Sequence, residues 1–178
     1  QNALVANDAS LSALSSSDPT CSSSAMFREY FGTTMQEYAE SESVISIPGC
    51  TNPSTCGSMI VAAYNNNYRN FYFPDGMDLN NSSGLPSPFG VNGEGVRLVS
   101  PGDININGNI VINGLIFSNS ANFNDLGTGT ADINGAMITC AAYNNNGSGL
   151  LNYTSGNLGS SGLGVGQMIR VPGSWRDF

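Results

Sequence analysis

The chain has 178 residues and a net charge of −8, and charged residues occupy only 10% of it, against about 25% in typical soluble domains. It contains no lysine and no histidine, which excludes imidazole-based triads and Schiff-base chemistry as well as any lysine-based phosphate grip. The net charge argues strongly against nucleic acids and anionic membranes as partners, because both bind clustered Lys and Arg.

The first 48 residues are predicted to be the helical part of a single domain that spans 1–178. Aromatic and apolar residues recur at spacings of three and four over roughly 25–39, after a serine N-cap at Ser23 or Ser24. Gly32 falls in the middle of this amphipathic helix, where glycine costs about 1 kcal/mol relative to alanine.

Residues 49–154 are predicted to form the β-structure. Short β-branched or aromatic segments bounded by Asn, Gly or Pro predict strands at 58–64, 70–74 and 96–100. A long turn-rich loop lies between the last two and is expected to be exposed. The echo between "MIVAAYNNN" (59–67) and "MITCAAYNNN" (137–146) indicates either two equivalent edge strands or chance similarity.

The stretch "DININGNIVINGLIF" alternates isoleucine with Asn or Gly. Five isoleucines share parity and would point to one side of an extended chain: Ile104, Ile106, Ile110, Ile112 and Ile116. The tripeptide Ile-Asn-Gly recurs at 106–108, 112–114 and 133–135. This pattern predicts rungs of a short β-solenoid, with isoleucine inside and hydrogen-bonded asparagine ladders. The alternative is an antiparallel meander with Asn-Gly turns.

Four cysteines, an even number, indicate disulfides, and the neutral, Asn/Ser-rich composition is typical of an extracellular protein. Cys50 and Cys56 flank a short polar loop with a proline turn, so we pair them. Cys21 and Cys140 then pair by elimination, although four cysteines allow three connectivities.

The run "GDININGNIVINGLIFSNSANFNDLGTGTADINGAMITC", the later "LLNY" and the closing "VPGSWRDF" resemble the C-terminal half of PilX-like minor pilins of the type IV pilus system. The match covers roughly 98–178. The resemblance implies a non-catalytic subunit of an extracellular, cell-surface filament. Its partners would be other pilin subunits or a separate hydrophobic helical chain. The hydrophobic helix of that family has no counterpart here, so membrane anchoring is not carried over to any residue.

The segment 155–178 is interpreted as a glycine-rich linker followed by a C-terminal strand or tail. Tryptophan and arginine are frequent interface anchors, which makes Trp175, Arg176 and Phe178 candidates for docking on a neighbouring subunit. The alternative is a final strand that packs back on the domain.

Other candidate sites are weak. Asp75, Asp78 and Asn80 offer oxygen ligands for calcium but lack the full spacing of a calcium loop, so no metal and no cofactor are expected. Carboxylates near the repeats, Asp103, Asp125 and Asp132, would serve a polysaccharide-cleaving enzyme only if they converged, and acidic residues beside Gly and Asn are usually turn formers.

The sequence therefore predicts an α+β protein in which an N-terminal helical segment packs on a β-sheet that continues into a short β-solenoid-like region. No apolar run is long enough for a membrane span. The expected function is a structural pilin-like subunit, with surface glycans as further partners. The rival is a secreted carbohydrate-binding or adhesive β-solenoid module unrelated to pili.

Overall fold

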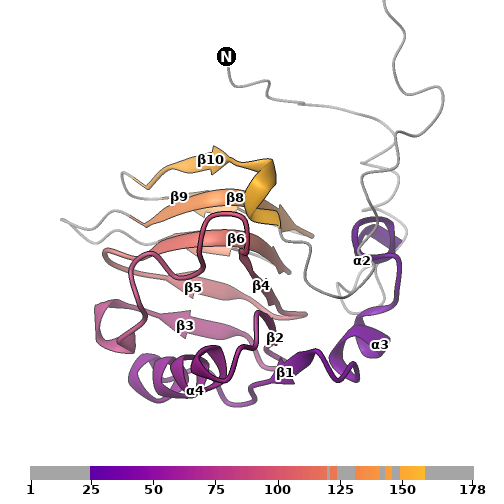
Figure 1. The fold of residues 1–178 in the computed structure, drawn as a ribbon, viewed down its shortest axis with the longest axis horizontal. Helices are drawn as coiled ribbons and strands as arrows, with labels where there is room; N and C mark the ends of the chain where they lie inside the picture. The colour runs from indigo at the N-terminus through magenta and orange to yellow at the C-terminus, as the bar shows by residue number, and fades with distance from the viewer. Residues whose placement is uncertain (1–24, 120, 124–130, 141–142, 146–148, 159–178) are drawn as a thin grey trace, which may run out of the picture.

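The computed structural model describes residues 25–119, 121–123, 131–140, 143–145 and 149–158, in which helices and strands are mixed as the α+β class requires (Figure 1). The strands form two sheets. In sheet order, the six-stranded sheet contains β1 (Val44–Ser46), β2 (Asn70–Tyr72), β4 (Val96–Val99), β6 (Val111–Ser118), β8 (Asp132–Thr139) and β10 (Leu151–Tyr153). The four-stranded sheet contains β3 (Met77–Leu79), β5 (Ile104–Ile106), β7 (Ala121–Phe123) and β9 (Tyr143–Asn145).

From β2 onward the chain alternates between the two sheets, so that each strand pairs in parallel with the strand two steps earlier. Parallel neighbours need a crossover connection, and here each crossover passes through the other sheet. The alternative of an antiparallel meander is therefore wrong for these strands.

The predicted isoleucine face is the interior between the sheets. All five isoleucines of the alternating stretch are buried in the larger of two hydrophobic clusters. Two copies of the tripeptide are paired rung on rung, because 112–114 of β6 lie in register with 133–135 of β8. The first copy, 106–108, instead ends β5 and turns at Gly108, whose φ is +89°.

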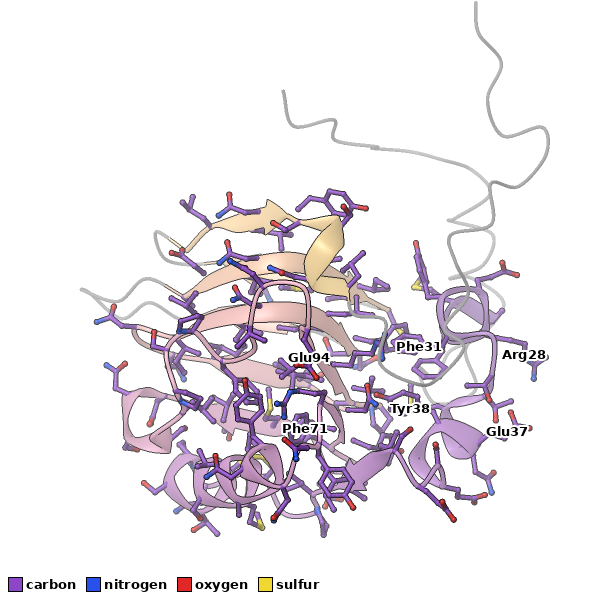
Figure 2. The ribbon with its side chains drawn as sticks, viewed as in Figure 1. Arg28, Phe31, Glu37, Tyr38, Phe71 and Glu94 are labelled. Carbon is purple, nitrogen blue, oxygen red and sulfur yellow. A yellow bond between two sulfur atoms is a disulfide. The ribbon has the colours of Figure 1, made fainter. Side chains whose placement is uncertain are left out.

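The outer face of the six-stranded sheet is also covered, by α2 (Ala25–Phe31) and α3 (Met35–Ala39). Phe27 and Phe31 hold their ring centroids 4.9 and 5.7 Å from that of Phe117 on β6. Figure 2 shows Phe31 and Tyr38 between the helices and the sheet, while Arg28 and Glu37 project outward. This aromatic cluster packs α2 and α3 against the sheet.

The single helix expected over 25–39 is two short helices. Gly32 has a φ of +69°, which ends α2, and Thr34 then caps α3. The Glu37 carboxylate accepts from the Thr34 backbone N–H at 2.9 Å and from the hydroxyls of Thr33 and Thr34. These hydrogen bonds, the backbone one first, lower the pKa of Glu37 to about 2.

The strand predicted at 58–64 is wrong, because this segment belongs to the helix α4 (Pro53–Asn65). Asn52 caps the helix by accepting from the Thr55 N–H at 3.2 Å, and Pro53 occupies its first turn. The predicted disulfide Cys50–Cys56 ties that turn to the preceding loop. The echo of 59–67 in 137–146 therefore does not mark equivalent strands.

The loop predicted between 75 and 95 is not fully exposed. It contains β3, whose Met77 and Leu79 are buried, and Phe89 packs in the same interior cluster. The boundary expected at residue 48 also shifts, since β1 already belongs to the six-stranded sheet. β1 and β3 have only three residues each, too few to show a clear alternation, and the turn residues around them obscured the strand signal in the sequence.

The two ends of the stacked strands differ. At one end α4 packs on β3 and on the 3₁₀ turn η2 (Asn81–Ser83), and its Ile60 is buried in the interior cluster (Figure 1). At the other end the final strand of the six-stranded sheet is β10. A second 3₁₀ turn, η3 (Ser155–Leu158), follows β10 and lies against β8, β6 and β4. Across the described ranges, no helix combines the length and apolar character that a membrane span needs.

Candidate functional site

The three candidate calcium ligands are used in separate hydrogen bonds. Asp75 accepts from the Gly49 N–H at 2.9 Å, and Asp78 accepts from the Asn105 amide at 2.6 Å. Asn80 caps η2 by accepting from the Ser82 N–H at 2.8 Å. In the part of the chain that the structure describes, no group of three His, Cys, Asp or Glu side chains is placed to hold a metal.

The carboxylates near the repeats also serve as acceptors. Asp103 accepts from the Asn119 amide at 3.2 Å, and Asp132 accepts from the Leu150 N–H at 3.1 Å. The remaining predicted site residues, Asp125, Cys21, Trp175, Arg176 and Phe178, lie outside the described residues. Cys140, the expected partner of Cys21, is disulfide-bonded.

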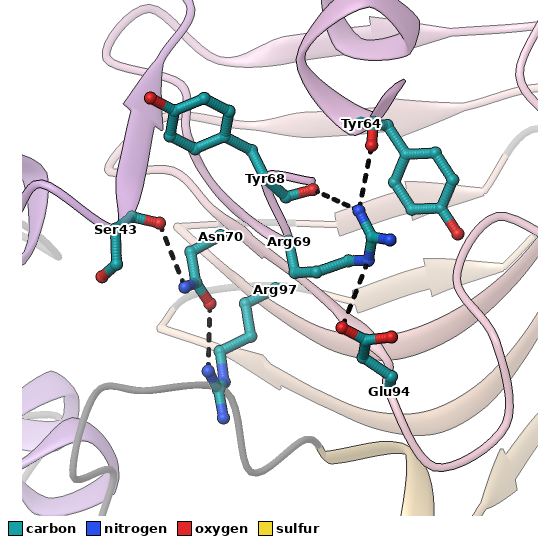
Figure 3. A network of polar contacts seen from close by, with 7 residues as sticks. All are labelled: Ser43, Tyr64, Tyr68, Arg69, Asn70, Glu94 and Arg97. Carbon is teal, nitrogen blue, oxygen red and sulfur yellow. Dashed lines mark hydrogen bonds and ion pairs between the residues drawn. The ribbon is translucent and has the colours of Figure 1, made fainter. Parts of the chain in front are cut away.

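A polar network that the sequence did not predict centres on Arg97 (Figure 3). Arg97 is the largest fully buried side chain of the described residues, at 1% exposed. Its Nη1 donates to Asn70 Oδ1 at 3.0 Å, and its Nη2 donates to the Leu158 carbonyl at 3.1 Å. The Asn70 amide in turn donates to the Ser43 carbonyl at 3.2 Å. The network therefore joins the start of β1, strands β2 and β4, and η3.

Tyr38 of α3 is electrostatically coupled to Arg97. Burial raises the pKa of Tyr38, and the charge of Arg97 opposes this only in part. Burial likewise lowers the pKa of Arg97, and Tyr38 opposes that change. Within the described residues the Tyr38 hydroxyl is buried and has no hydrogen-bond partner. Tyr38 thus stays protonated at neutral pH, and cannot serve as a base there.

A second arginine, Arg69, lies between α4 and β2 and reaches back to the C-terminal end of α4. Its Nη1 donates to the carbonyls of Tyr64 and Tyr68, both at 3.0 Å, and its guanidinium carbon lies 4.1 Å from the centroid of the Tyr64 ring. The last carbonyls of a helix lack intrahelical donors, so Arg69 acts as a C-terminal cap. Its Nε lies 3.8 Å from Glu94 Oε1, a pair of little energy because Glu94 is 57% exposed.

Beside Arg69 lies an open pocket of about 260 Å³. It is lined by Ser43, Asn66, Asn67, Tyr68, Arg69, Asn70 and Glu94. Amides both donate and accept hydrogen bonds, and the tyrosine adds a flat apolar ring. Only one carboxylate lines the pocket, so it lacks the paired acid and base of a glycoside hydrolase. Its chemistry suits binding of a neutral, hydroxyl-rich ligand.

The predicted asparagine ladder is present on the outer face of the six-stranded sheet. Asn134 donates to Asn113 Oδ1 at 3.0 Å, and Asn152 donates to Asn134 Oδ1 at 3.3 Å. The ladder is not wholly a surface feature, since Asn113 is buried and donates to the Gly90 carbonyl at 3.1 Å. The series of amide hydrogen bonds therefore runs from the buried Gly90 carbonyl, through Asn113 and Asn134, to the exposed Asn152 on β10.

Sequence reasoning missed Arg69, Asn70 and Arg97. The available signal was "VRLVS", in which one arginine interrupts a strand of apolar residues. A lone arginine in such a strand usually faces solvent, and only the contact of η3 with this sheet face reveals its burial. No family model, no curated protein and no solved structure matches this chain.

Proposed function

We propose that the chain is a non-catalytic structural subunit of an extracellular, type IV pilus-like filament, and that its paired sheets are a short β-solenoid. The observation that carries the proposal is the aromatic docking of α2 and α3 on β6. In a filament subunit, force must pass between the N-terminal helical segment and the globular β-structure. A helix pair fastened by buried aromatic rings meets that need.

Three further features support a structural role. The terminal segment "VPGSWRDF" resembles the tail of PilX-like minor pilins. The parallel ladders distribute load over many backbone hydrogen bonds, and α4 with its disulfide closes one end of the interior. The partners proposed are neighbouring pilin subunits or a separate hydrophobic helical chain. Trp175, Arg176 and Phe178 remain proposed contacts.

The proposal is tested on filaments sheared from cells that produce this protein. We expect mass spectrometry to find the chain in the filament fraction, and immunogold labelling to place it on the filaments. The variant Trp175→Ala should lower its filament content roughly tenfold, a loss typical of an interface anchor, at equal total protein. Tyr30→Ala, which changes an exposed aromatic residue on α2, is the control. Absence of the wild-type chain from every filament would contradict the proposal.

The pocket beside Arg69 favours a second candidate function, the binding of neutral surface glycans. Its amides and its tyrosine ring match the hydroxyls and the apolar face of a sugar. Tyr68 is the residue to change, because Arg69 also caps α4 and its loss would disturb the helix. The proposal concerns adhesion and involves no cleavage.

Binding is measured by retention on immobilised neutral oligosaccharides. We expect Tyr68→Ala to weaken retention roughly tenfold, about the 1.4 kcal/mol of one lost aromatic contact. Tyr30→Ala should retain full binding. If the wild-type chain binds no neutral oligosaccharide, or if both variants lose binding equally, the pocket is not a glycan site.

A further inference from the structure

The β10 end of the six-stranded sheet exposes a cluster of apolar side chains. Of the five large hydrophobic residues that are exposed in the described ranges, three lie here: Leu150, Leu151 and Tyr153, at 58%, 46% and 65%. Leu151 is in register with Ile133 of β8, which is buried in the interior cluster. Leu151 therefore extends the row of interior side chains by one strand, to the exposed edge of the sheet. The end opposite α4 therefore presents core-type residues to solvent.

Within the described residues, β10 is the edge strand of the six-stranded sheet. The Leu150 carbonyl accepts from the Ile133 N–H, and the Thr154 N–H donates to Gly135, so these alternate residues face β8. In a strand the residues between them point the other way, which directs the backbone groups of Leu151 and Tyr153 away from β8. Among the described strands, β10 pairs only with β8.

We propose that this end is a self-docking surface, at which two copies of the chain pair their β10 strands antiparallel about a two-fold axis at Asn152. This register sets Leu151 opposite Tyr153 of the other copy, twice, as pairs that exchange both N–H···O bonds. The apolar side chains then meet on the interior face. The two Asn152 side chains meet on the other face and extend the amide ladder by one step.

The charge distribution favours a second copy as the occupant. Two identical surfaces on chains of charge −8 repel unless the contact is neutral, and residues 143–145 and 149–158 contain no charged side chain. Head-to-tail stacking is blocked because α4 covers the other end of the interior. The surface thus supports a closed pair and not an open fibre.

The local path of the chain leads away from this edge. Directly after β10, η3 crosses the outer face of β8, β6 and β4. Asn157 fixes it there by donating to the Asn134 carbonyl at 2.9 Å and accepting from the Gly93 N–H at 3.2 Å. The Leu158 carbonyl is held by Arg97. The inference does not depend on the filament proposal.

Sedimentation of the whole chain over a wide concentration range tests the pairing. We expect a reversible dimer that Asn152→Asp weakens at least about tenfold at neutral pH, because two carboxylates then face each other across the axis. The change is nearly isosteric, and Asn152 is exposed. Ser155→Asp, which adds the same charge at an exposed position off the axis, should weaken the dimer much less. Equal weakening by both variants would overturn the proposed register.

Cross-linking gives a positive test. Cα atoms of a non-hydrogen-bonded antiparallel pair lie about 4.5 Å apart, which a disulfide spans. Asn152→Cys is therefore expected to give an intermolecular disulfide on mild oxidation, and Ser155→Cys is expected not to. A chain that is monomeric at every concentration, with no selective cross-link, overturns the proposal. Pairing that appears only after removal of 159–178 would identify that segment as the occupant and also overturns it.

Discussion

Replacing Gly135 by alanine is expected to destabilise the protein by at least about 3 kcal/mol, at the upper end of overpacking effects. A Cβ at Gly135 would lie 1.8 Å from the Gly114 carbonyl oxygen on the neighbouring strand. The obstacle is backbone, so no side chain can move aside, and β8 must separate from β6. Gly114 is equally confined, since its Cβ would lie 1.9 Å from the Val96 oxygen.

The free energy of unfolding is measured by urea denaturation followed by circular dichroism. Gly156→Ala is the matched control, because a Cβ there meets nothing within 4 Å. It should change the unfolding free energy by no more than about 0.5 kcal/mol. A Gly135→Ala protein as stable as this control would show that the two strands do not approach so closely.

These glycines show how much of the fold was predictable. The recurrence of Ile-Asn-Gly placed isoleucine inside and asparagine in a ladder, because alternation on an extended chain depends only on local geometry. Glycine closes each copy of this tripeptide. Its close approach to the neighbouring strand depends on the register between 112–114 and 133–135, which the repeat implied but did not prove.

The wrong prediction for 58–64 has a different cause. "SMIVAAY" is rich in β-branched and aromatic residues, which favour strands. The signal that decides its structure lies upstream, where Asn52 and Pro53 start a helix. The disulfide at Cys56 and the buried Ile60 then hold that helix against the interior. Local propensity was overridden by a cap and by packing.

The candidate sites were less predictable than the fold. The absence of lysine and histidine chemistry follows from composition alone and needs no geometry. The pocket beside Arg69 joins Ser43, the end of α4 and Glu94, which are far apart in sequence. The β10 surface is recognisable only once the order of the strands is known. Spatial sites of this kind carry no contiguous sequence signature.

Replacing Arg97 by alanine is expected to cost about 3–5 kcal/mol of unfolding free energy. The change removes the largest fully buried side chain and leaves the Asn70 amide oxygen and the Leu158 carbonyl without this donor. Buried acceptors that lose their donor cost about 1–3 kcal/mol each, and the cavity adds to that. The unfolding free energy of Arg97→Lys should lie between those of the wild type and Arg97→Ala, because one ammonium group cannot span both acceptors as a guanidinium group does.

Arg28→Ala is the control, since Arg28 is exposed on α2 and should change stability by no more than about 0.5 kcal/mol. Hydrogen exchange separates the role of Arg97 from general packing. Because Arg97 holds the last residue of η3, its loss should raise exchange at 155–158 beyond the rise expected from the lower global stability. If Arg97→Ala were as stable as Arg28→Ala, or if η3 stayed protected, the network would not be what fastens η3 to the sheet.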